Sequence, residues 1–69
     1  MREWLKTLRT EKGFTMKEMG TKLGISESYY CAIENGERQK KMDIVLIAGI
    51  SSALNVSVAR IVQYESEMH

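Results

Sequence analysis

The chain has 69 residues, with ten basic and nine acidic side chains and a formal net charge of +1. This length allows one small domain and no second one. No apolar run approaches the roughly 18 residues of a membrane span, the charged N-terminus does not resemble a signal peptide, and the lone cysteine cannot form an internal disulfide. We therefore expect a cytoplasmic protein.

The first two helices are predicted by their ends as much as by their apolar spacing. Apolar residues recur at helical spacing within residues 2–12, and Gly13 follows as a stop signal. Thr15 and Glu18 match the capping-box pattern, in which each side chain bonds the backbone of the other, so a second helix begins there. Gly24 ends that helix.

Three further helices follow the same logic. Ser26 can cap a third helix that Gly36 terminates, so residues 15–36 form two short helices joined by a tight turn. Asp43 can cap a fourth helix that runs to about residue 54, and Asn55 suits the left-handed position after it. Ser57 can cap a fifth helix.

Five short helices with short connections predict an all-α fold, a compact five-helix bundle containing a helix-turn-helix. We expect residues 1–64 to form a single domain. Residues 65–69, which include the only histidine, His69, are predicted to be a short disordered tail.

Four segments of the chain, in this order and spacing, resemble the lambda-repressor-like (Cro/C1/Xre-type) helix-turn-helix domains of phage and bacterial regulators. The matching segments are LKTLRTEKGFT (5–15), MGTKLGIS (19–26), SYYCAIENG (28–36) and SSALNVS (51–57). The resemblance implies that the third helix is a recognition helix, which lies in the major groove of double-stranded DNA.

The resemblance also assigns base contacts to three residues of the third helix, namely Glu27, Ser28 and Ala32. Their chemistry fits this role, because glutamate can accept from cytosine N4, serine can donate or accept, and a methyl group can contact thymine. The alternative for Glu27 is that it only interacts favourably with the helix dipole.

Contacts with the DNA backbone are expected from the surroundings of this helix. Arg38, Lys40 and Lys41 follow it directly, and we call residues 36–43 the basic loop. These cations would neutralise phosphates beside the groove, although a short charge run is also typical of a solvated loop. The remaining candidates for backbone contact are Lys17, Tyr29 and Asn35. Met16 stands where the family usually has a phosphate-binding glutamine.

Arg9 and Glu34 match family positions that pair in the interior and join the first helix to the end of the third. A guanidinium suits a buried, two-bonded carboxylate, so the resemblance implies a structural ion pair. The alternative is that both are ordinary exposed charges.

Residues 44–59 contain no charged side chain. One stripe (Ile44, Ile47, Ile50, Ser51 and Leu54) is predicted to face the core. The remaining face lacks the charges of a monomer's surface helix, which favours a homodimer that reads a palindromic operator. The alternative is a more deeply buried helix. The predicted interface residues are Val45, Leu46, Ala48, Gly49, Ser52, Val56, Ile61 and Tyr64.

Two functions remain open. The first is a sequence-specific transcriptional regulator, a repressor of phage or mobile-element type. The second is a protein-interaction module, such as an antitoxin or antirepressor, that kept the fold but binds DNA weakly or not at all. No catalytic constellation, metal cluster, cofactor motif or small-molecule site is predicted, so we expect no enzyme. Cys31, on the outward face of the third helix, is either a filler residue or a redox sensor.

Overall fold

Local capping chemistry determines where four of the five helices begin. The Thr15 hydroxyl accepts from the Glu18 amide at 3.0 Å, and the Glu18 carboxylate accepts from the Thr15 amide at 2.8 Å, which completes the predicted capping box. Ser26, Asp43 and Ser57 each accept from the backbone N–H three residues later. These predicted caps are confirmed.

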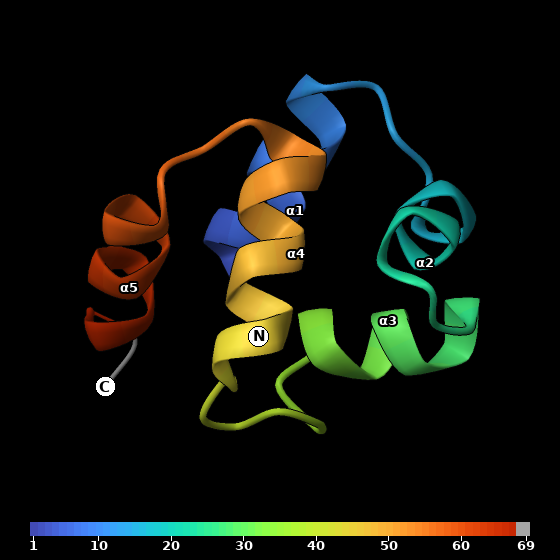
Figure 1. Cartoon of the computed structure of the whole chain (residues 1–69). Coiled ribbons are helices and arrows are strands. Elements are labelled where there is room, and N and C mark those ends of the chain that lie inside the picture. Colours follow the sequence, from blue (N-terminus) through green and yellow to red (C-terminus); the bar gives the residue numbers. More distant parts are fainter. Residues whose placement is uncertain (68–69) are drawn as a thin grey trace.

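The computed structural model describes residues 1–67, and these form five helices without a strand. They are α1 (Glu3–Glu11), α2 (Met16–Leu23), α3 (Glu27–Glu34), α4 (Ile44–Leu54) and α5 (Val58–Ser66). The all-α prediction is confirmed. In Figure 1, α4 lies in the middle, with α1 behind it, α2 and α3 on one side and α5 on the other. No one of these helices has the length and apolarity to cross a membrane by itself; α4 and α5 meet that test only as a pair bent by 117°.

The core contains side chains from all five helices. Its fully buried members are Leu5, Met19, Tyr30, Ile33, Ile50, Leu54 and Ile61. The prediction that Ile61 lies in a subunit interface is therefore wrong, because this side chain is enclosed within one chain. Ile44, predicted to face the core, is 79% exposed. Ile44 and Val45 at the start of α4 project away from the core, and the core contacts of this helix begin at Leu46 and Ile47.

The turn between α2 and α3 is fixed by a close backbone approach. The Ile25 amide donates to the Gly20 carbonyl at 2.8 Å. A Cβ on Gly20 would lie 2.9 Å from the Ile25 carbonyl oxygen, so the turn passes directly over a residue without a side chain. Gly24 occupies the left-handed region within this turn, as its place in the sequence predicts. The orientation of α3 on α2 therefore depends on these glycines.

The predicted pair of Arg9 and Glu34 is present and buried. Arg9 Nε and Nη2 donate to the two carboxylate oxygens of Glu34, at 2.9 and 3.2 Å. Arg9 Nη1 also donates to the Phe14 carbonyl at 2.8 Å. The pair thus ties α1 and the connection after it to the last residue of α3.

The C-terminal boundary differs from the prediction. Helix α5 extends through Ser66, and the Glu65 carboxylate accepts from Trp4 Nε1 at 3.0 Å. The Trp4 and Tyr64 rings stack with centroids 5.3 Å apart. Glu65 and Ser66 are therefore ordered parts of the bundle, and the expected tail does not begin after Tyr64. Its last two positions, including His69, lie outside the described residues.

Candidate nucleic-acid interface

Helix α3 has one face in the core and one in solvent. Tyr30 and Ile33 are fully buried, whereas Glu27 and Ser28 are exposed in its first turn. The Ser26 hydroxyl accepts from the Tyr29 amide at 3.0 Å, which stabilises this first turn. The cap and the buried face thus hold the N-terminal end of α3 in place, with two polar side chains exposed to solvent.

The three predicted base-contacting residues are not equally accessible. Glu27 and Ser28 are adjacent and exposed, whereas Ala32, one turn further on, is half-buried. The Ala32 carbonyl accepts from the amides of Glu37 and Arg38, at 2.8 and 3.2 Å. The basic loop therefore folds back against the end of α3, and the accessible part of the predicted reading surface is centred on the first turn.

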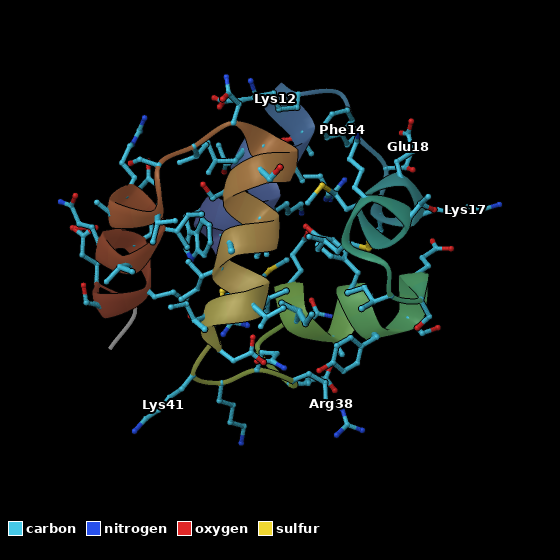
Figure 2. All side chains as sticks on the ribbon, in the orientation of Figure 1. Lys12, Phe14, Lys17, Glu18, Arg38 and Lys41 are labelled. Carbon is cyan, nitrogen blue, oxygen red and sulfur yellow. The ribbon has the colours of Figure 1, made fainter. Side chains whose placement is uncertain are left out.

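Exposed cations flank α3. Lys17 lies in the first turn of α2, and Arg38, Lys40 and Lys41 lie in the basic loop. In Figure 2, Arg38 and Lys41 point outward from the loop below α3, and Lys17 points outward from α2. Among residues 1–67, none of these four side chains forms an ion pair. Their positive charges are therefore available to bind an anionic partner.

Tyr29 is linked to the basic loop by Gln39, a residue that the sequence did not indicate. Gln39 Nε2 donates to the Tyr29 hydroxyl at 3.0 Å, and its Oε1 accepts from the Asp43 amide at 3.3 Å. Gln39 has a φ of 52°, in the left-handed region that non-glycine residues rarely adopt. One side chain thus joins the half-buried Tyr29 to the N-cap of α4.

The other predicted backbone contact in α3, Asn35, is exposed and follows the last helical residue. Its Nδ2 donates to the Cys31 sulfur at 3.5 Å. Cys31 is half-buried, which fits the interpretation of this thiol as a small filler residue.

Arg2 is the second residue that the sequence did not indicate. It is 1% exposed, although it lies in a charged N-terminal segment. Its Nη1 donates to the carbonyls of Ile33, at the end of α3, and Arg38, the latter at 3.3 Å, and its Nη2 donates to the Gln39 carbonyl. The partners lie 31 to 37 residues away in the sequence, so no local pattern could have revealed them.

The predicted subunit interface divides into two groups. Val45, Ala48 and Ser52 form an exposed stripe on α4, with Val45 78% exposed, and the unexpectedly exposed Ile44 adjoins it. The other group already has partners within the chain. Leu46 and Val56 pack against the core, Gly49 lies against Leu23, and Tyr64 stacks on Trp4.

Comparison with known proteins agrees with this geometry. The chain is 51% identical over 39 residues to the uncharacterized HTH-type transcriptional regulator YqaF of Bacillus subtilis (strain 168). The match covers 56% of this chain and 51% of the relative, so it spans about half the length of that protein. No solved structure matches. The helix-turn-helix family matches residues 5–61, which include α2, α3 and most of the bundle. The chain therefore belongs to the Cro/C1-type helix-turn-helix family of DNA-binding transcription regulators.

Proposed function

We propose that this protein is a sequence-specific repressor of phage or mobile-element type, which acts in the cytoplasm as a homodimer on a palindromic operator. It has no enzymatic step in this role. Repression follows from occupancy, since a bound dimer excludes polymerase from the overlapping promoter. Each subunit places α3 in the major groove, and half-sites are separated by whole helical turns.

The observation that carries the proposal is the arrangement around the first turn of α3. Glu27 and Ser28 are exposed there, while the opposite face of the helix is held by the core and by the Arg9–Glu34 pair. A rigid helix with polar first-turn residues is suited to reading base edges. Unpaired cations beside it supply the phosphate contacts that position such a helix.

Dimerisation is supported by the exposed apolar residues of α4 and α5. Ile44 and Val45 in α4 are 79% and 78% exposed, and Val58 and Val62 in α5 are 45% and 49% exposed. The two helices pack against each other. Several large exposed apolar side chains on two neighbouring helices of a small protein favour an interface, and a second copy of this chain would bury them.

The alternative function, a protein-interaction module such as an antitoxin or antirepressor, is favoured by one observation. The first turn of α3 holds no arginine, asparagine or glutamine, the residues that most often make two-bonded contacts with bases. In that case the apolar residues of α4 would bind a different protein.

A binding experiment separates these functions. Fluorescence anisotropy compares the affinity of the protein for DNA from its own upstream region with its affinity for scrambled DNA of equal length. We expect at least about a 1,000-fold preference for the upstream fragment. Replacing Glu27 and Ser28 with alanine should reduce that ratio by at least about 30-fold, since two base contacts worth about 1–3 kcal/mol each are lost.

Glu3→Ala is the matched control, because Glu3 is also an acidic residue in the first turn of a helix, on α1. This variant should keep the preference of the original protein. Absence of binding to either DNA, or a preference that the Glu27 and Ser28 substitutions leave unchanged, would contradict the proposed reading surface.

A further inference from the structure

Arg2 brings together three parts of the molecule that are distant in sequence. Besides its contacts with Ile33, Arg38 and Gln39, it donates from Nε and Nη2 to the two oxygens of Glu65 on α5, at 2.9 and 3.0 Å. Glu65 in turn accepts from Trp4. The guanidinium thus lies between α5, the end of α3 and the basic loop.

Apart from the Gln39 side-chain bonds to Tyr29 and Asp43, the basic loop has few constraints on its middle besides Arg2. Its start is held by the Glu37 and Arg38 amides, which donate to the Ala32 carbonyl, and its end by the Asp43 cap of α4. Between these points the backbone carbonyls of Arg38 and Gln39 both accept from Arg2. Gln39 adopts an unfavourable positive φ there, so the local conformation requires support from outside the loop.

Arg2 cannot contact phosphate directly, because it is 1% exposed. Its effect on DNA would have to pass through the residues that it holds. Arg38 carries one of the two carbonyls that Arg2 binds, and Lys40 and Lys41 directly follow Gln39, which carries the other. The direction of these three cations therefore depends on the position of a buried guanidinium.

We propose that Arg2 is a positioning residue for the basic loop, and that Glu65 on α5 holds Arg2 in place. This inference rests on the proposed function for its effect on DNA binding, since the loop is there assigned to phosphate contacts. It also links α5 to the loop, so an intact C-terminal helix becomes a condition for ordered phosphate contacts. The guanidinium is required because its planar fork reaches a carboxylate and several carbonyls at once.

Two variants and one control test this role. Arg2→Lys keeps the positive charge but replaces the fork with a single ammonium, which cannot reach Glu65, Ile33 and the loop together. Glu65→Gln keeps the shape of the side chain but removes its charge. The matched control is Glu67→Gln, which makes the same chemical change at an exposed residue just beyond α5.

The first measurement needs no DNA. Backbone ¹⁵N relaxation gives order parameters for residues 38–42 in each folded variant. We expect about 0.85 in the original protein and in Glu67→Gln, and a fall below about 0.6 in Arg2→Lys, with a smaller fall in Glu65→Gln. Unchanged order parameters in folded Arg2→Lys would overturn the inference. If Arg2→Lys does not fold, unchanged values in Glu65→Gln would overturn it equally.

The second measurement is the salt dependence of DNA binding. Each phosphate contact contributes about 0.9 to the magnitude of the log–log slope, so loss of an ordered loop should flatten the slope by about two or more for a dimer. A purely structural role for Arg2 would lower stability and leave this slope unchanged in folded protein. That result would overturn the positioning role. Failure of the original protein to bind DNA would contradict the proposed function, while the relaxation data would still decide the role of Arg2.

Discussion

The Glu34 carboxylate, which has no exposed surface, accepts two hydrogen bonds from the Arg9 guanidinium. Removing one partner of a buried ion pair leaves the other charge without compensation, so Glu34→Ala should cost on the order of 3–5 kcal/mol in the free energy of unfolding. Urea denaturation measures this loss. Glu37→Ala, at an exposed position three residues away, should change stability by under about 0.5 kcal/mol. A loss below about 1 kcal/mol for Glu34→Ala would mean that the pair is solvated in solution.

Removing the Tyr30 hydroxyl is expected to have the opposite effect on the free energy of unfolding. It is buried and has no hydrogen-bond partner among residues 1–67, and burial raises the pKa of this phenol. Tyr30→Phe removes an unsatisfied polar atom and keeps the ring in the core, so it should leave stability unchanged or raise it by about 1 kcal/mol. Thermal unfolding provides the measurement, with Tyr29→Phe as the control that removes the bond to Gln39. A loss above about 2 kcal/mol for Tyr30→Phe would show that the hydroxyl donates to the nearby carboxylate of Glu34.

The capping box of α2 predicts a dependence on pH. Hydrogen bonds from Thr15, chiefly from its backbone N–H, lower the pKa of Glu18 in the folded protein. A lowered pKa contributes stability that is present above the ordinary carboxyl pKa of about 4.3 and is lost as the pH falls through the folded value. Glu18→Gln cannot titrate. The stability difference between the original protein and this variant should therefore shrink as the pH is lowered from about 6 to 3.

Glu11→Gln controls for the loss of one exposed carboxylate on a helix. Chemical denaturation at several pH values gives the comparison. If the two variants show the same pH dependence, the capping bond does not contribute to acid sensitivity.

The basic loop should dominate the salt dependence of DNA binding. If three side chains in each subunit of a dimer contact phosphates, the log–log slope of affinity against salt should be about −5. Replacing Arg38, Lys40 and Lys41 with glutamine should remove this contribution and leave only the smaller slope that comes from Lys17. The control positions are Lys6 and Lys12, which are exposed cations on or beside α1. Figure 2 shows Lys12 at the opposite end of the molecule from Arg38 and Lys41. A flat slope for the original protein would exclude the loop from phosphate contact.

The exposed stripe of α4 predicts the effect of a single charge. In a homodimer, Val45→Glu would place a carboxylate in an apolar interface, and the dimer should dissociate with a dissociation constant raised by at least about 100-fold. Thr7→Glu, which adds the same charge at an exposed position of α1, should leave the dimer intact. Sedimentation equilibrium measures both. A monomer at high micromolar concentration for the original protein would contradict the dimer.

The helix ends were predictable from sequence because their chemistry is local. Thr15, Ser26, Asp43 and Ser57 each bond an amide three residues away, and Asn55 needs only a left-handed conformation. Such interactions need no knowledge of the rest of the fold. Periodicity was less successful at the start of α4 and within α5, where burial depends on how the neighbouring helices pack. Ile44 was expected inside and is exposed, and Ile61 was expected at an interface and is buried.

The parts of the candidate site that were missed depend on distant residues. Arg2 and Gln39 look like ordinary polar residues in the sequence, since charged groups near a terminus or in a loop are usually solvated. Their roles arise only when α5, the end of α3 and the loop are brought together. Resemblance to a family did not help, because the Arg2 contacts involve none of the four matching segments except the end of α3.

The stacking of Trp4 on Tyr64 has a practical consequence. Trp4 is the only tryptophan in the 69 residues, and its ring and its N–H both contact the last turns of α5. Its fluorescence will therefore respond when α5 leaves the bundle, whereas circular dichroism follows all the helices together. Coincident unfolding curves from the two signals would mean that the bundle melts as one cooperative unit, and an earlier fluorescence change would mean that α5 separates first. The protein thus contains its own optical reporter for the attachment of its final helix.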